Sequence, residues 1–272
     1  MMKTVRLKKV DEEIPNIQIA ADSVVLFLLT HNVYIVPFTK ILTNMPTNCV
    51  GNPRFLRELE VYLHEEVERN KYYIGDVYAE DDIRMLIRYL TSYFAYYDDG
   101  DLQNFLKMNS RYSYDRETPE TIQKKAFQRL KGFLFEKLVE AMIRPMYEEK
   151  ECLFECGCEI EVDGRAIRVQ HDGISRKTVD VAGLNSLIES GDMLECKVQP
   201  IWINEATVKY MHCLLNELRA AGYRNIRVGF ATAGSKAVAQ YKLMKALSEI
   251  QIKNAELLIY NLSDLREWTV GA

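Results

Sequence analysis

Three charged residues interrupt apolar segments in the second half of the chain. Asp180 stands between two valines, and Glu195 and Lys197 alternate with apolar residues in Met-Leu-Glu-Cys-Lys-Val. Alternate side chains of a strand share a face, so Glu195 and Lys197 are expected to lie side by side. If the strand that carries Asp180 pairs with theirs, three charges converge on one face of a sheet. Burying them is costly unless they pair with one another or with a counter-ion.

Two neighbouring carboxylates repel each other, and a divalent cation relieves that repulsion. Oxygen ligands that leave part of the shell open suit Mg²⁺, with Mn²⁺ as a possible substitute. Such an ion lowers the pKa of a bound water and neutralises charge on a phosphate under attack. A lysine beside it can position the attacking water and stabilise the anionic transition state. The pattern therefore indicates metal-dependent hydrolysis of a phosphodiester.

The setting of the triplet matters more than the triplet itself. An acidic residue two positions before a lysine is expected by chance in a chain of this composition. It occurs a second time as Glu148-x-Lys150, where the surrounding residues are charged and a solvated pair is expected. Only the Glu195-x-Lys197 copy lies in an apolar strand.

The pattern of apolar residues predicts the elements around this triplet. A helix begins at Thr118–Pro119 and ends near Pro145, and the Asp163–Gly164 turn indicates a hairpin. Capping residues and apolar periodicity predict the rest. In chain order we expect strands at 152–162, 165–171, 177–184 and 193–198 with a turn at Gly191–Asp192, a helix at 204–222, a strand at 226–230, a helix at 235–250 and a strand at 256–261.

This arrangement resembles the PD-(D/E)XK nuclease superfamily over roughly residues 120–232. The resemblance consists of Asp180, a gap of fourteen residues, Glu195-Cys196-Lys197 on the next strand, and the order helix, three strands, helix, strand. Glu136, in Gly-Phe-Leu-Phe-Glu, resembles a glutamate of the family's first helix. Val179 stands where the motif's name has proline. No Gln-x-x-x-Tyr follows the lysine, which argues against the RecB-like exonuclease branch.

The resemblance implies a fold and a set of roles. The fold class is α/β, a restriction-endonuclease-like mixed central sheet flanked by helices. Asp180 and Glu195 would bind the metal, Glu136 would be an auxiliary ligand, and Lys197 would position or activate the water. Gln199 could extend the site, although a polar strand end is the simpler interpretation. The resemblance further implies a restriction or defence endonuclease that acts on duplex DNA and works as a homodimer.

The distribution of charge divides the chain near residue 118. The net charge is −4; residues 1–118 hold 14 basic and 18 acidic residues, and the remainder holds 21 of each. We therefore expect a mainly helical N-terminal domain, residues 1–118, for recognition, regulation or assembly, and a nuclease-like domain, residues 119–272. A neutral second half permits DNA binding without supporting it. Nine cations could line a groove, with a solvated helix face as the alternative for the first five: Lys124, Lys125, Arg129, Lys131, Lys137, Arg165, Arg168, Arg176 and Lys177.

The cysteines raise, and then weaken, the idea of a zinc site. Cys152, Cys156 and Cys158 share the apolar parity of a strand, which favours core thiols. No second cysteine pair or close histidine pair provides a fourth ligand.

The apolar segment Val24–Phe38 is too short and too polar to span a bilayer, and it does not resemble a signal peptide. A cytoplasmic protein is expected.

Two other functions remain open at this point. A nuclease fold can serve as a catalytically silent binding or scaffold module, although the complete set of Asp180, Glu195 and Lys197 argues against that. The chain could also be a ligand-regulated RNase or nickase, with the N-terminal domain as the sensor. No glycine-rich phosphate loop is visible there to support a sensor.

Overall fold

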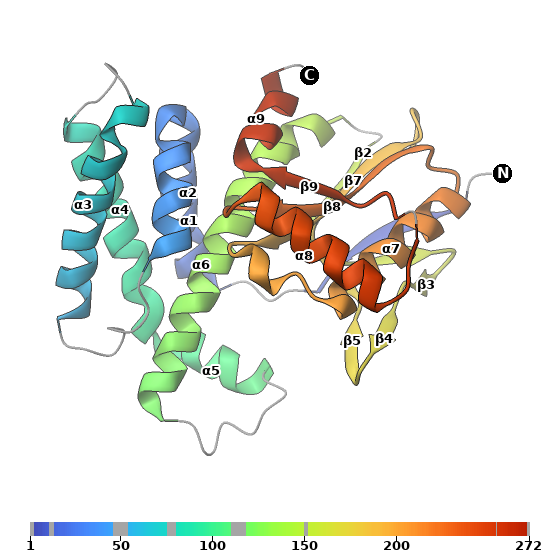
Figure 1. Cartoon of the computed structure of the whole chain (residues 1–272), viewed down its shortest axis with the longest axis horizontal. Coiled ribbons are helices and arrows are strands. Elements are labelled where there is room, and N and C mark those ends of the chain that lie inside the picture. The colour runs from blue at the N-terminus through green and yellow to red at the C-terminus, as the bar shows by residue number, and fades with distance from the viewer. Residues whose placement is uncertain are drawn as a thin grey trace. The chain divides into compact units, whose positions relative to one another are not determined.

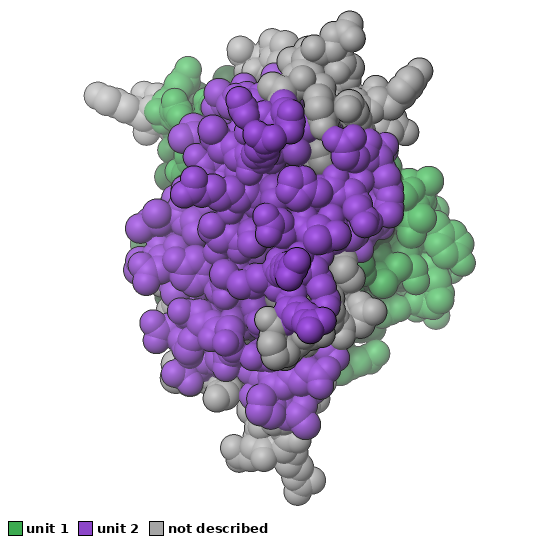
Figure 2. All heavy atoms as spheres, turned by 90° about the vertical axis from the view of Figure 1, so that its left-hand side faces the viewer, with its two compact units in different colours: residues 1–12, 138–272 green, residues 13–137 purple. Residues whose placement is uncertain are grey.

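The chain forms two compact units, coloured separately in Figure 2. The first unit contains residues 1–12 and 138–272, and the second contains residues 13–137. The computed structural model describes residues 3–10, 14–45, 54–74, 80–109, 118–149, 152–253 and 255–270.

A seven-stranded mixed sheet forms the centre of the first unit. Its path runs β1-β2-β6-β7-β8-β9, and β3 is an additional partner of β2. Neighbours from β1 to β7 are antiparallel, whereas β7, β8 and β9 are parallel to one another. The strands are β1 Val5–Lys9, β2 Cys152–Val162, β3 Arg165–Ala166, β6 Thr178–Asn185, β7 Ser190–Lys197, β8 Asn225–Thr232 and β9 Leu258–Asn261.

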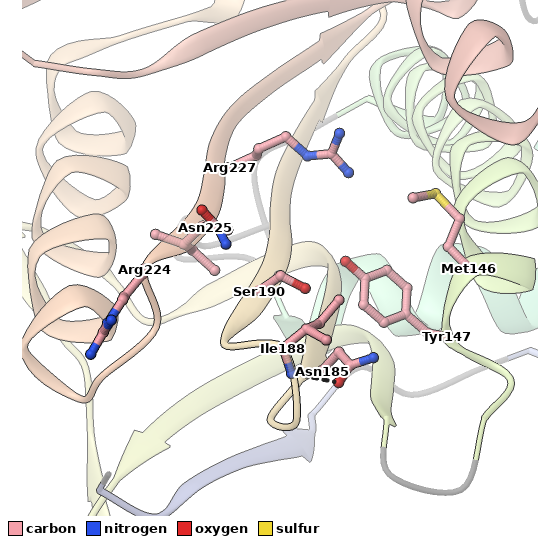
Figure 3. Close-up of a pocket in the computed structure, with 10 residues that line it drawn as sticks. Met146, Tyr147, Asn185, Ile188, Ser190, Arg224, Asn225 and Arg227 are labelled. Atoms are coloured by element: carbon pink, nitrogen blue, oxygen red, sulfur yellow. Dashed lines mark hydrogen bonds between the residues drawn. The ribbon is translucent and has the colours of Figure 1, made fainter. Parts of the chain in front are cut away.

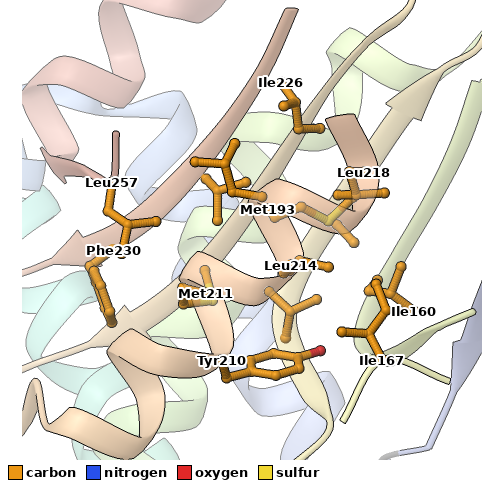
Figure 4. Close-up of a cluster of buried hydrophobic side chains, with 14 of the residues drawn as sticks. Ile160, Ile167, Met193, Tyr210, Met211, Leu214, Leu218, Ile226, Phe230 and Leu257 are labelled. Carbon is orange, nitrogen blue, oxygen red and sulfur yellow. The ribbon is translucent and has the colours of Figure 1, made fainter. Parts of the chain in front are cut away.

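Helices cover this sheet and make the connections that parallel strands require. Helix α7 (Glu205–Ala220) joins β7 to β8, and α8 (Lys236–Glu249) joins β8 to β9. Both cross the front of the sheet in Figure 1. Figure 4 shows the core between α7 and the strands, where Met211 and Leu214 face Met193. Three further helical segments belong to this unit: η5 (Arg144–Tyr147), η6 (Pro200–Trp202) and α9 (Leu262–Val270).

A small ribbon stands apart from the main sheet. Among the strands of the described residues, β4 (Val169–His171) and β5 (Ile174–Arg176) pair only with each other, and both pack against α7. The turn between them places Asp172 at φ 47° and Gly173 at φ 75°. Two successive left-handed residues are the signature of a type I′ hairpin turn, which matches the natural twist of the strands.

The second unit is helical. Its helices bury one apolar stripe each, as Ile83, Leu86 and Leu90 do on α4. The Tyr93 hydroxyl donates to the Leu130 carbonyl at 2.8 Å, which ties α4 to the first part of α6. The elements are α1 Pro15–Thr30, η1 Asn32–Tyr34, α2 Ile35–Asn44, α3 Phe55–Ile74, α4 Glu80–Phe94, η3 Ala95–Asp98, α5 Gly100–Asn109 and α6 Pro119–Ile143, which continues into the first unit.

Among the described helices, none alone has the length and apolar composition to cross a bilayer. Helix α1 together with the residues Asn32–Asn44 reaches both, but the two halves are bent by 105°.

The mixed sheet flanked by helices and the mainly helical N-terminal region agree with the predicted α/β class, and the restriction-endonuclease-like fold stays a prediction. The division of the chain differs from the predicted boundary between residues 118 and 119. The first half of α6 packs within the helical unit, where Phe127 contacts Phe94. Strand β1, which was not predicted, pairs with β2 across more than 140 residues of sequence and so joins the first unit.

Two local predictions were wrong. Residues 165–171 do not form one strand, because β3 ends at Ala166 and Val169 starts the separate ribbon. Gly191 and Asp192 do not form a turn; they lie inside β7, and the turn is at residues 186–189.

Candidate active site

Asp180, Glu195 and Lys197 meet on adjacent strands of the sheet. The Lys197 Nζ donates to Glu195 Oε1 at 2.6 Å, and the backbone N–H of Cys196 donates to Asp180 Oδ2 at 2.6 Å. The Glu195 side chain is only 4% exposed and that of Lys197 is 17% exposed. The charges are therefore withdrawn from bulk water, where an ion pair is stronger than at the surface.

Strand register explains the meeting. Strands β6 and β7 are antiparallel, with Val181 opposite Leu194. Asp180 precedes Val181 and Glu195 follows Leu194, so Asp180 and Glu195 are the next opposite pair. Glu195 and Lys197 are two residues apart and share a face, as their contact shows. A short turn at residues 186–189 is enough to bring the two strands side by side.

The electrostatics favour a charged lysine at this place. Burial of Lys197 disfavours the ammonium form, but the neighbouring carboxylates of Glu195 and Asp180 outweigh that effect and raise its pKa. Lys197 is therefore protonated at neutral pH. It can stabilise negative charge and hold a water, but in this state it cannot accept a proton.

Arg176 adds a second cation to the same carboxylate. Its guanidinium nitrogen NH1 lies 3.9 Å from Glu195 Oε1, the oxygen that also binds Lys197. Arg176 ends β5, and the packing of the ribbon on α7 directs it there. Its Nε is buried and has no hydrogen-bond partner within the described residues. A buried donor of this kind is costly unless an acceptor arrives.

Tyr210 approaches Glu195 from α7. Its side chain is fully buried, and its hydroxyl has no hydrogen-bond partner among the residues that the structure describes. Burial raises the pKa of the Tyr210 phenol, and the negative charge of Glu195 raises it further. Tyr210 was not predicted, because a tyrosine in an apolar helical stripe looks like an ordinary core residue.

The structure also describes the two other residues predicted for the site, Glu136 and Gln199. Glu136 is on α6 in the part that belongs to the helical unit, and its Oε1 accepts from Arg129 NH1 at 3.3 Å. Its role as an auxiliary ligand stays a prediction. Gln199 follows the end of β7 and precedes η6, so it is a strand-end residue.

The predicted basic groove loses one of its members. Lys131 is 2% exposed, and burial lowers its pKa to about 8, so it cannot line a groove. Its Nζ lies 3.4 Å from the Met45 carbonyl. Lys124 pairs with Glu120 at 2.6 Å on the same helix, as expected for a solvated helix face.

Near the ribbon, the cations Arg168 and Lys177 converge on buried Glu159. Lys177 lies 2.5 Å and Arg168 lies 3.5 Å from its carboxylate. The hydrogen bond from Lys177 holds the pKa of Glu159 below its usual value, and Arg168 contributes in the same direction. These two cations neutralise a protein carboxylate and are not simply presented to solvent.

The side chains at the candidate site suit a hard cation. Asp180 and Glu195 offer carboxylate oxygens, and within the described parts of the chain no cluster of three or more His, Cys, Asp or Glu side chains could enclose a metal. A two-carboxylate site with water and substrate completing the shell is typical of Mg²⁺. Cys152 and Cys156 are half-buried and Cys158 is buried.

Comparison with known proteins gives only a remote similarity. No family model matches the chain, and no curated protein matches it. Ten chains of solved structures match, among them Can2 from Sulfobacillus thermosulfidooxidans in complex with cyclic tetra-adenylate (cA4). That match has a TM-score of 0.31 and 14% sequence identity, and it covers 86% of this chain and 52% of the other. The chain thus spans about half the length of that structure, and the similarity is too remote to assign a family.

Proposed function

We propose that the chain is a metal-dependent nuclease that hydrolyses phosphodiester bonds at Asp180, Glu195 and Lys197. One observation supports this most directly: two carboxylates and a charged lysine meet on adjacent strands, with Lys197 Nζ 2.6 Å from Glu195 Oε1. A purely structural ion pair needs one carboxylate for one lysine. Here a second carboxylate and a second cation, Arg176, gather at the same place.

Asp180 and Glu195 would hold Mg²⁺, or Mn²⁺ in its place. The bound ion would activate a water and neutralise charge on the phosphate. Carboxylate oxygens fit this ion, and the number of protein ligands fits one that keeps several waters. The N–H of Cys196 fixes the orientation of the Asp180 carboxylate, which prepares it for a ligand.

The two cations would act on the substrate. Lys197 is held charged by its neighbours, so it would stabilise the developing charge on phosphate and orient the attacking water through its N–H groups. Arg176 would donate its unused Nε–H to a non-bridging phosphate oxygen, which would satisfy the buried donor. Arg176 was predicted only as one of several groove cations; its contact with Glu195 gives it a place in the site.

Duplex DNA is the first substrate class to test, within a restriction or defence role and with a homodimer as the working form. A cytoplasmic location is part of the same proposal. The second candidate is a ligand-regulated RNase or nickase, in which the helical unit would respond to a small molecule. Cyclic tetra-adenylate, which Can2 holds in the structure described above, is the first ligand to include in that test.

The test is a cleavage assay with the full chain. Plasmid DNA, single-stranded DNA and RNA are each incubated with Mg²⁺, Mn²⁺ or EDTA, with and without cyclic tetra-adenylate. The proposal predicts metal-dependent cleavage of at least one substrate and none in EDTA. Cleavage that persists in EDTA would contradict it. Binding without cleavage under every condition would instead support the scaffold module.

A further inference from the structure

A pocket of about 500 Å³ lies at the opposite end of the strands from the candidate active site. Ser190 begins β7 and lines the pocket, whereas Glu195 is five residues farther along the strand. At about 3.3 Å per residue, the two positions are ~16 Å apart. Figure 3 shows Met146 and Tyr147 on one side, facing Ser190, Asn225 and Arg227 on the strands. The pocket is therefore separate from the proposed site of hydrolysis.

One wall of the pocket is held rigidly by a buried carboxylate. Asp192 is fully buried; Arg227 donates to its two oxygens at 2.6 and 2.8 Å, and the Tyr147 hydroxyl donates at 2.6 Å. The Arg227 guanidinium also stacks on the Trp268 ring, 3.8 Å from its centroid. Asp192 on β7 and Trp268 on α9 thus fix Arg227, and Asp192 also fixes Tyr147, at the pocket. Such support is typical of a preorganised binding site.

The polar groups of the lining are mainly donors. Asn185 Oδ1 already accepts the N–H groups of Leu187 and Ile188, which leaves its Nδ2 as the donor end. Arg227 uses Nε and one terminal nitrogen on Asp192, and its side chain is 37% exposed. Ser190 and Asn225 add a hydroxyl and an amide.

The charged side chains of the lining also favour an anionic ligand. Among the described residues that line the pocket, Arg224 and Arg227 are charged and none is acidic. Arg224 Nε pairs with Glu189 at 3.0 Å beside the pocket, and Arg227 pairs with buried Asp192. Burial of the Arg227 guanidinium opposes its charge, but the hydrogen bonds to Asp192 outweigh this and raise its pKa, so Arg227 stays protonated. Arginine and amide donors together suit an acceptor-rich anion such as a phosphate.

The remaining lining is apolar and suits an organic body. Met146, Ile188 and Ile226 contribute aliphatic surface, and Tyr147 contributes an aromatic ring. The volume falls within the range of small-molecule sites, about 300 to 1,000 Å³. We infer that this pocket binds a phosphate-bearing small molecule of about mononucleotide size. The inference does not depend on the proposed nuclease activity.

The test is isothermal titration calorimetry on the full chain with three probes: AMP, adenosine and inorganic phosphate. We expect AMP to bind and adenosine to bind at least about tenfold more weakly, because the donors recognise the phosphate. Equal affinity for AMP and adenosine would overturn the inference. A failure of all three probes to bind at millimolar concentration would also overturn it.

Two variants locate the binding. Asn185→Asp keeps the Oδ1 that closes the turn but replaces the donor by a negative oxygen, so AMP affinity should fall about tenfold or more. Its matched control is Asn216→Asp, at an exposed asparagine of α7, which should bind AMP like the wild type. Arg224→Glu at the rim of the pocket should also weaken the binding of AMP. Arg219→Glu, which lies outside the pocket, should leave it unchanged.

The variants also separate this pocket from the active site. Lys197→Ala should leave AMP affinity unchanged. Unchanged affinity in both pocket variants, or loss of AMP binding in Lys197→Ala, would show that AMP binds elsewhere and would overturn the inference.

Discussion

Lys197 Nζ and Arg176 NH1 approach the same oxygen of Glu195, at 2.6 and 3.9 Å. The two cations come from different parts of the fold, Lys197 from β7 and Arg176 from the β4–β5 ribbon. With Asp180 on the adjacent strand, they form a compact group of two carboxylates and two cations.

Arg176 should act on substrate binding. Arg176→Ala removes the buried donor, so the dissociation constant for an oligonucleotide measured in EDTA should rise by about tenfold or more. Arg176→Lys should restore affinity only in part, because lysine lacks the planar fork. Fluorescence anisotropy with a labelled oligonucleotide measures the dissociation constants of both variants.

The matched control for Arg176 is Arg168→Ala. Arg168 is 59% exposed and pairs with Glu159 rather than Glu195. The Arg168→Ala substitution should therefore reduce the affinity for the oligonucleotide much less than Arg176→Ala does. Equal losses in the two variants would indicate general attraction by positive charge rather than a specific contact.

The pH dependence of stability should reveal the charged state of Lys197. Its pKa is raised in the folded protein above the ordinary 10.5, so its ion pair stabilises the fold fully below pH 10.5. That stabilisation is lost as the pH rises through the folded-state pKa. The difference in unfolding free energy between wild type and Lys197→Met should therefore be constant at neutral pH and shrink in strong alkali.

Urea unfolding across this pH range gives the measurement, with Lys236→Met as the control. Lys236 is half-exposed and pairs with Asp264 at the surface, so its removal should change stability little at any pH. A wild-type advantage over Lys197→Met that disappears near neutral pH would show that Lys197 is not held charged.

Tyr147 should stabilise the fold through the buried Asp192 carboxylate. Tyr147→Phe removes one hydrogen bond to a fully buried charge, which should cost about 1.5 to 3 kcal/mol in the free energy of unfolding. Tyr241→Phe, on an exposed tyrosine of α8, should change stability by less than about 0.5 kcal/mol. Chemical denaturation of both variants compares them directly, and equal stabilities would contradict the role of the hydrogen bond.

Glycine is required where β8 meets β9. A Cβ on Gly229 would lie 2.1 Å from the Leu258 carbonyl oxygen, so Gly229→Ala should disrupt the parallel pairing and lower the thermal midpoint strongly. Gly132 lies inside α6, where a Cβ would meet only Glu136 Oε1, at 3.6 Å. Gly132→Ala should raise stability by about 0.5 to 1 kcal/mol. A tolerated Gly229→Ala would contradict the strand pairing.

The sequence was sufficient to bring Asp180, Glu195 and Lys197 together, because the period of a strand and a short connection determine which side chains share a face. It was also sufficient for α6, which begins at Pro119 and ends at Ile143, close to the predicted bounds. Local patterns of this kind do not depend on distant parts of the chain.

The remaining features depend on contacts between distant segments. Val5 pairs with Val162, and no local pattern in a five-residue strand predicts that partner. The contact of Arg176 with Glu195 requires the ribbon to fold against α7. The pocket needs Tyr147 and Arg227, which are 80 residues apart, to meet at Asp192.

The central claim is that Asp180 and Glu195 bind the catalytic ion. The most direct measurement follows the electron paramagnetic resonance of free Mn²⁺ during titration of the full chain with an oligonucleotide present. We expect the wild type to bind Mn²⁺. Asp180→Asn and Glu195→Gln should each bind Mn²⁺ at least about tenfold more weakly. Glu256→Gln, a control at an exposed surface residue, should bind Mn²⁺ like the wild type. Equal Mn²⁺ affinity in all four proteins would contradict the claim.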